Sequence, residues 1–324
     1  MITTPFLRHA AMACATSLAL AFALVSTTHA AAPMVKTSAP GYYRIMLGDF
    51  EVTAISDGTV QLPMDKILSG ISAPDFDKAI KKYHLTNPID TSVNAYLINT
   101  GSKLVLIDTG AGGFFGPTLG KLLADIKAAG YQPEQVDEIY ITHMHGDHIG
   151  GLTSNGVANF PNAIVRVGKG DADYFLSQAN LDKAPADKKD GFEHAISAFQ
   201  PYIASGHFKT IDSDTELVPG VKAVGAHGHT PGHTTYLVES KGQKLILWGD
   251  LMHVAAVQFD NPSVAVHFDS DSKEAIAARK KDYAAAAKEG YLIGSAHLSF
   301  PGLGYLRAEG KGYVWMPVNY VSLP

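Results

Sequence analysis

The segment from Glu138 to Gly151 constrains this chain more than any other stretch of its sequence. Residues 138–141 read EIYI, and residues 142–151 then read THMHGDHIGG. The apolar run predicts a buried β-strand, and the two closing glycines predict a sharp turn after it. Imidazole and carboxylate groups suit divalent metals such as zinc. Three histidines and one aspartate at a strand end therefore indicate a metal site rather than a polar loop of solvated histidines.

The spacing within this segment indicates two metal ions. Side chains alternate along an extended chain, so His143 and His145 could bind one ion, and Asp147 with His148 could bind a second. Each ion would still lack ligands. Polar residues follow three later apolar runs, and we expect these strand ends to supply the missing ligands: His229, Asp250 and His297.

Strand-like runs recur along the chain, and helical patterns separate several of them. The expected strands are Tyr43–Leu47, Phe50–Ile55, Ala95–Asn99, Leu104–Ile107, Glu138–Thr142, Ala163–Val167, Val221–Ala226, Thr235–Val238, Leu245–Trp248 and Tyr291–Ser295; the expected helices are Pro117–Ala129, Asp171–Gln178 and Ser272–Lys288. We therefore expect one α/β domain over residues 31–324. In this αββα sandwich, two mixed β-sheets lie face to face with helices outside. Residues 59–90 and 179–215 are expected to be long loops at the rim of the site.

Residues 1–30 have the pattern of a secretory signal peptide. Arg8 and His9 precede an apolar stretch, Ala10–Val25, and small residues lead to an expected cleavage site after Ala30. The stretch is shorter than the roughly 20 residues that span a bilayer, so we expect a periplasmic or secreted protein without a membrane anchor. The chain's one cysteine, Cys14, lies in this segment, so the expected mature chain has no thiol for catalysis or metal binding.

The charge of the chain argues against a nucleic-acid partner. The formal net charge is −5, and no basic run occurs. We expect a small-molecule substrate instead, and a homodimer is compatible with the sequence.

The metal motifs resemble, in order, those of the metallo-β-lactamase superfamily, and Asp108-Thr109-Gly110 resembles its early Asp-Thr-Gly strand end. Four further stretches are similar to the methyl parathion hydrolase subgroup, which includes organophosphate hydrolases and enzymes that act on lactones and aryl esters such as dihydrocoumarin. These stretches are residues 41–44, 48–51, 177–185 and 307–313.

The resemblance implies a role for each candidate residue. His143, His145 and His229 would hold one divalent ion, Asp147, His148 and His297 the other, and Asp250 would bridge them. Asp108 would support the ligands. His227 and His233 are alternatives to His229 as the ligand, because the three histidines fall within seven residues. The family pattern favours His229, and hydrogen bonds that support the ligands or stabilise the turn are the expected role of the other two, above all of His233. Zinc is the expected metal, with manganese, cobalt and iron as alternatives. A hydroxide held between the ions would attack the substrate, and Asp147 would take up a proton.

The substrate follows from residues that the resemblance places near the metals. His253 stands three residues after Asp250, where related lactonases often carry tyrosine, and could donate a hydrogen bond to a carbonyl. The expected pocket wall consists of Leu62, Ile67, Phe115, Phe175, Phe192, His253 and Phe268, although packing in the core would use the same residue types. This wall favours a neutral aromatic lactone or ester, with phosphotriesters as secondary substrates. The alternatives are a primary organophosphate hydrolase and a non-catalytic metal-binding module.

Overall fold

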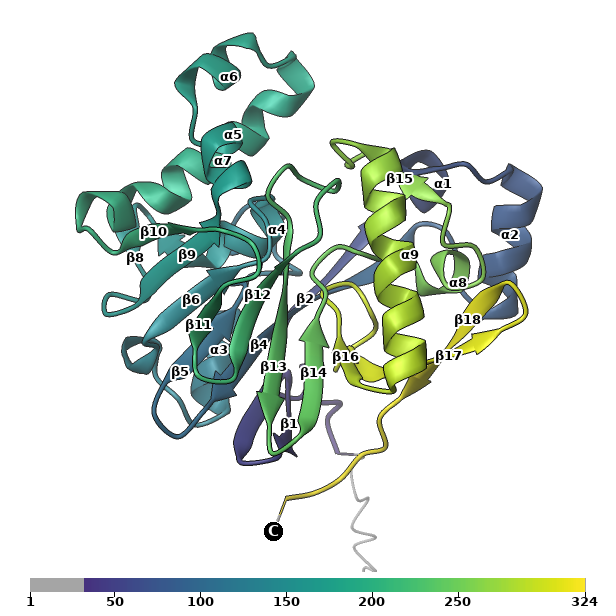
Figure 1. Ribbon diagram of the computed structural model, residues 1–324, viewed down its shortest axis with the longest axis horizontal. Coiled ribbons are helices and arrows are strands. Elements are labelled where there is room, and N and C mark those ends of the chain that lie inside the picture. The colour runs from purple at the N-terminus through teal and green to yellow at the C-terminus, as the bar shows by residue number, and fades with distance from the viewer. Residues whose placement is uncertain (1–31, 324) are drawn as a thin grey trace, which may run out of the picture. The chain divides into compact units, whose positions relative to one another are not determined.

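Two seven-stranded mixed β-sheets form the centre of the protein (Figure 1). The computed structural model describes residues 32–323, and residues 39–323 pack as one unit. The expected signal peptide lies outside the described residues. No helix in the described range 32–323 has the length and apolar character needed to cross a membrane.

The first sheet has the order β1-β2-β4-β5-β6-β9-β10, and the second has the order β11-β12-β13-β14-β16-β17-β18. The strands of the first are β1 (Tyr42–Leu47), β2 (Phe50–Leu62), β4 (Ile89–Asn99), β5 (Leu104–Ile107), β6 (Glu138–Ile141), β9 (Ile164–Gly168) and β10 (Phe208–Ile211). Those of the second are β11 (Glu216–Val218), β12 (Val221–Gly225), β13 (Thr234–Ser240), β14 (Gln243–Leu247), β16 (Leu292–Gly294), β17 (Leu303–Glu309) and β18 (Gly312–Pro317). Short pairs join β3 (Leu68–Ser69) to β15 (Ala265–Val266) and β7 (Thr153–Ser154) to β8 (Val157–Ala158).

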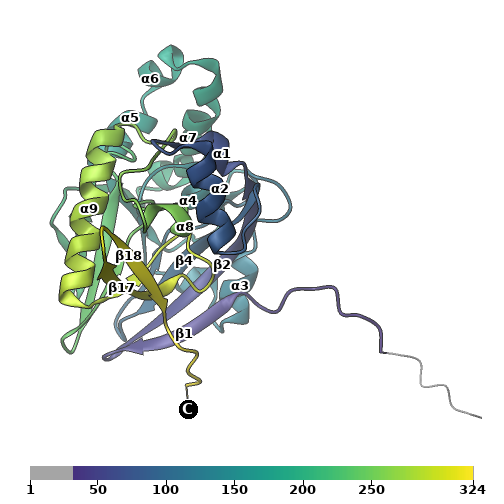
Figure 2. The same ribbon diagram turned by 90° about the vertical axis from the view of Figure 1, so that its right-hand side faces the viewer.

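The described residues also form helices around the two sheets. They are α1 (Met64–Ile67), α2 (Ala73–Lys82), α3 (Leu122–Ala128), α4 (Gly146–Ile149), α5 (Lys169–Phe175), α6 (Gln178–Lys183), α7 (Ala186–Ala204), α8 (Ala255–Gln258) and α9 (Ser272–Glu289), with 3-10 turns at Pro133–Gln135 and Gly150–Leu152. Of these helices, α9 and α3 lie on opposite sides of the two sheets (Figure 2). One apolar core lies between the first sheet and α3, α5 and α7, and another between the second sheet and α9. A third core, which includes Val105, Tyr140 and Tyr236, joins the two sheets. The expected αββα sandwich is thus confirmed.

The expected loop over residues 179–215 was wrong, because α7 occupies most of it. Gly191 and Pro201 interrupt the sequence pattern, but Phe192, Phe199 and Tyr202 recur at helical spacing and are buried against the first sheet. Burial of this apolar face outweighs the poor helix propensity of the two residues.

Residues 59–90 likewise hold the end of β2 together with α1 and α2. The side chain of Ser72 caps α2 by accepting a hydrogen bond from the backbone of Asp75. The helix expected from Pro117 begins only at Leu122. Asp57, from β2, accepts hydrogen bonds from the backbone N–H groups of Gly120 and Leu122, which holds the preceding residues in a loop.

Candidate metal centre

The carboxyl ends of parallel strands bring the candidate ligands together. β5 and β6 are parallel neighbours in the first sheet, and β14 and β16 are parallel neighbours in the second. Segments just beyond these strands carry most of the polar residues, and the loop between β12 and β13 carries His229. Because the sheets lie face to face, the residues from both halves meet at one edge of the sandwich.

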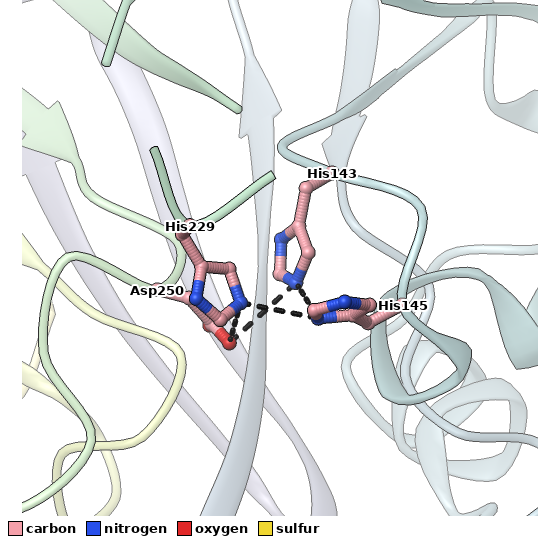
Figure 3. A group of neighbouring side chains, drawn as sticks. All are labelled: His143, His145, His229 and Asp250. Atoms are coloured by element: carbon pink, nitrogen blue, oxygen red, sulfur yellow. Dashed lines mark hydrogen bonds and ion pairs between the residues drawn. The ribbon is translucent and has the colours of Figure 1, made fainter. Parts of the chain in front are cut away.

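Three imidazoles converge on one point (Figure 3). His145 Nδ1 lies 3.0 Å from His143 Nε2 and 3.1 Å from His229 Nε2. Asp250 Oδ2 lies 3.5 Å from His143 Nε2 and 3.2 Å from His229 Nε2. Ligands about 2.0–2.1 Å from a tetrahedral ion are about 3.3 Å apart, so this three-histidine set has the spacing that a zinc ion needs.

A second set shares Asp250 with the first. Asp250 Oδ1 lies 3.1 Å from both His148 Nε2 and His297 Nε2. Asp147 Oδ2 lies 3.6 Å from His148 Nε2 and 3.5 Å from His297 Nε2. Among the described residues, the buried atoms His148 Nε2 and Asp250 Oδ1 have no hydrogen-bond partner, although they lie close together. A cation between them would satisfy both, so the residues fit a dinuclear site.

The electrostatics of the histidines favour cation binding. Burial holds the pKa of His143 well below its usual range and lowers the pKa of His145 to about 3, so both rings are neutral and offer a lone pair. Burial also opposes protonation of His148, but the carboxylates of Asp250 and Asp147 raise its pKa well above the usual value. A divalent cation can take the place of that proton beside the same carboxylates.

The metallo-beta-lactamase superfamily profile matches residues 88–297, which include every candidate ligand. The chain belongs to this superfamily. Among curated relatives, an N-acyl homoserine lactonase from a Bacillus species is 28% identical over 202 residues, which cover 56% of this chain and 72% of that protein. An N-acyl homoserine lactonase from Bacillus cereus is 26% identical, and the matched region covers 57% of this chain and 73% of that protein.

Two solved structures resemble the protein over most of its length. The hydrolase AbOPH has a TM-score of 0.84 and 39% identity, with 88% of this chain and 100% of that chain covered. AidC, a dizinc quorum-quenching lactonase in complex with a product, has a TM-score of 0.81 and 26% identity. The match covers 87% of this chain and 99% of that chain. The protein is therefore a hydrolase of the metallo-β-lactamase fold.

Both residues expected to support the ligands contact the cluster. Asp108 Oδ2 accepts a hydrogen bond from His148 Nδ1 at 2.8 Å, which directs the other ring nitrogen towards Asp250. His233 Nε2 accepts the backbone N–H of Asp250 at 3.0 Å, and burial lowers the His233 pKa to about 3, so that nitrogen is free to accept. His227 instead lies 3.3 Å from Ser213 Oγ, outside the ligand sets.

Sequence reasoning missed three supporting residues. Asp269 Oδ1 lies 2.9 Å from His229 Nδ1 and orients that ring. Gln258 Oε1 accepts the backbone N–H groups of His253 and Val254, which fixes the segment after the bridging aspartate. Asp171 accepts hydrogen bonds from two ligand-bearing segments. All three act across turns or between distant segments, so no local motif signals them.

The structure corrects several expected pocket residues. Phe175, in α5, and Phe192, in α7, are buried in the core between these helices and the first sheet. The ring of Phe175 also meets that of His145 edge-on, with the ring centres 5.8 Å apart. Ile67, at the end of α1, is buried in a further core that α1 forms with α2 and α8, and Leu62 packs against that core. Phe175, Phe192 and Ile67 are thus core residues, whereas Leu62 is half-buried at the edge of its core.

The other two aromatic residues lie at the surface beside the cluster. Phe115 is 46% exposed and sits against Gly146, where an added Cβ would meet its ring at 3.0 Å. Phe268 is 44% exposed, with its ring centre 6.3 Å from that of His253. His253 itself is buried, and its Nε2 lies 3.0 Å from Asp250 Oδ2.

The glycines after the metal motif serve close packing rather than the sharp turn expected from sequence. Gly150 has a helical φ of −63°. A Cβ at Gly150 would lie 2.0 Å from Ala111 O, and one at Gly151 would lie 2.0 Å from Thr109 O. The two glycines therefore let the loop after β5 approach the metal motif.

Proposed function

We propose that the protein is a dinuclear zinc hydrolase that cleaves lactones and aryl esters, with phosphotriester cleavage as a secondary activity. The observation that carries this proposal is the exposure of Asp147. Its side chain is 25% exposed, whereas those of His148 and Asp250 are almost completely buried. A structural metal site closes its ligand shell, while a catalytic one leaves a position that substrate can reach. The opening at Asp147 therefore favours catalysis over a metal-binding module.

Each ligand residue has a task in this reaction. Two divalent cations, when bound, supply Lewis acidity and lower the pKa of a coordinated water. Asp250 would hold the two ligand sets together, because its Oδ1 lies beside His148 and its Oδ2 beside His229. Burial would raise the pKa of Asp147, but His148 and His297 keep it below its usual value, so the carboxylate is ionised. An ionised, accessible carboxylate can accept the proton of the attacking water.

The substrate class rests on the side chains beside the cluster. Phe115 and Phe268 offer exposed aromatic surface to a flat, neutral leaving group. His253 Nε2 lies 3.0 Å from Asp250 Oδ2. The neutral ring has one N–H, which in this proposal donates to a substrate carbonyl in place of the shared carboxylate. The lactonases among the relatives support the lactone part of the proposal. The stretches similar to methyl parathion hydrolases support the phosphotriester part.

A substrate panel tests this proposal. Purified protein with its metal content measured would be assayed on an aryl lactone, an aryl ester, a homoserine lactone and a phosphotriester. We expect the highest kcat/KM with the aryl lactone or ester and measurable turnover of the phosphotriester. A higher value for the phosphotriester would favour the organophosphate hydrolase. No turnover by protein that holds two ions would favour the non-catalytic module.

Two substitutions test the roles of the side chains. His253→Leu removes the hydrogen bond to the carbonyl, and Phe268→Leu makes room for a tetrahedral phosphotriester. A hydrogen bond or steric contact of about 1–3 kcal/mol corresponds to changes in kcat/KM of roughly tenfold to a hundredfold. We expect lactone turnover to fall and phosphotriester turnover to rise, with metal content unchanged. Tyr305→Leu, which changes an exposed aromatic residue of β17, is the matched control. Equal losses with both substrates would remove the basis for the carbonyl preference.

A further inference from the structure

Asp171 is a fully buried carboxylate that belongs to neither ligand set. It lies in the first turn of α5, directly after β9. Its Oδ2 accepts hydrogen bonds from the backbone N–H of Met144 and the hydroxyl of Thr230, both at 2.9 Å. Its Oδ1 accepts the backbone N–H of Gly232. Every donor comes from outside its own helix.

These donors belong to the two segments that carry the three-histidine set. Met144 lies between His143 and His145, beyond β6 of the first sheet, and Thr230 directly follows His229, between two strands of the second. One carboxylate thus ties together ligand segments from opposite halves of the sandwich.

The packing around Asp171 shows that this contact is close. A Cβ at Gly232 would lie 2.3 Å from the backbone nitrogen of Asp171. A Cβ at Gly170 would lie 2.6 Å from Pro231 O, and one at Gly168 would lie 2.3 Å from Gly232 O. Glycine at all three positions lets the start of α5 lie directly against the turn after His229.

The charge of Asp171 matters more for the three-histidine set than for the other. That set has one carboxylate, Asp250, which it shares, whereas the second set also has Asp147. A buried carboxylate without a cationic partner is costly, and a divalent cation nearby offsets that cost. Asp171 lies behind the three-histidine set, so its charge and its hydrogen bonds both favour an ion there.

We infer that Asp171 is a positioning residue for the three-histidine set. It aligns the segments that carry His143, His145 and His229, and so raises the metal affinity of this set over that of the other, without touching metal or substrate. The inference rests on the dinuclear site of the proposed function. It is tested by metal binding rather than by turnover, so a failure to cleave lactones would not affect it.

The test measures each ligand set separately. In a His297→Ala background the three-histidine set remains intact, and in a His229→Ala background the other set remains intact. Cobalt(II) would be titrated into the metal-free protein of each background and followed by absorption and calorimetry. We expect Asp171→Ala to raise Kd about 10- to 100-fold in the first background and less than about threefold in the second.

Two further variants separate positioning from general stability. Thr230→Val removes one of the three donors, and we expect a smaller shift in the same direction, with less than additive loss when it is combined with Asp171→Ala. If Asp171→Ala does not fold, the Thr230→Val variant alone tests the inference in both backgrounds. Asp57→Asn is the matched control, because Asp57 is buried and accepts backbone hydrogen bonds from Ala111, Gly120 and Leu122 but from no ligand segment. We expect Asp57→Asn to lower the free energy of unfolding and to change the cobalt(II) affinities of the two ligand sets by similar factors, if at all. Equal shifts in both backgrounds, or no shift in either, would overturn the inference.

Discussion

Substitution of Asp108 by asparagine tests how the second ligand set is oriented. Asp108 Oδ1 accepts the backbone N–H of Thr142 at 2.7 Å, and Oδ2 accepts the Thr142 hydroxyl at 2.7 Å and His148 Nδ1 at 2.8 Å. An amide of the same shape has only one oxygen. In either orientation its NH2 group faces a buried donor, the Thr142 N–H or the His148 ring N–H.

The cost follows from that mismatch. One buried donor without an acceptor destabilises a protein by about 1–3 kcal/mol. Loss of an orienting carboxylate behind a metal-bound histidine costs about 10- to 100-fold in metal affinity. We therefore expect Asp108→Asn to weaken the Asp147–His148–His297 set by this factor, and to leave the three-histidine set within about threefold.

Chelator competition on the His229→Ala and His297→Ala backgrounds would measure the two affinities, and urea denaturation would measure stability. Thr142→Ser is the matched control, since it retains the hydroxyl and the backbone N–H that Asp108 accepts. If Asp108→Asn loses stability as expected but the metal affinity of the Asp147–His148–His297 set stays within twofold of the parent, the orienting role of Asp108 is refuted.

Three further predictions follow from the site and its surroundings. Asp250→Ala removes the carboxylate shared by both sets. Elemental analysis should show the loss of at least one ion, and an activity assay should show the loss of nearly all turnover. Two retained ions would show that Asp250 is not the bridge. Removal of the metals with a chelator should lower Tm, because ions that bind only the folded chain stabilise it, and zinc should restore it; an unchanged Tm would argue against a built site. Burial raises the pKa of Asp282 from its ordinary value to about 6, so this carboxyl lowers stability as the pH rises from about 4 to about 6, and the loss is complete above that range. Asp282→Asn should therefore increase the free energy of unfolding by about 1–2 kcal/mol at pH 8, after allowance for partial exposure, and by little at pH 4; equal effects at both pH values would contradict the assignment.

The strand ends and the ligands could be predicted because their signals are local in the sequence. β5 was predicted with its observed bounds, because its apolar run between polar residues is too short for a helix and includes the β-branched residues Val105 and Ile107. The structure brings all seven candidate ligands together, since the ends of parallel strands meet at one edge of each sheet. By contrast, α7 was missed, because Gly191 and Pro201 conceal a helical pattern that only its burial against the first sheet stabilises.

By itself, the sequence determined which residues could hold metals and the layered architecture that brings them together. Tertiary structure alone decided which aromatic rings face the site. Phe192 and Phe115 are chemically alike, yet Phe192 is buried on the inner face of α7 and Phe115 is exposed beside Gly146. It also decided that Asp171, with no ligand motif around it, joins the ligand segments of both halves. Local periodicity records which face of an element is apolar, but burial and hydrogen bonding between distant segments depend on how the complete sheets and helices pack.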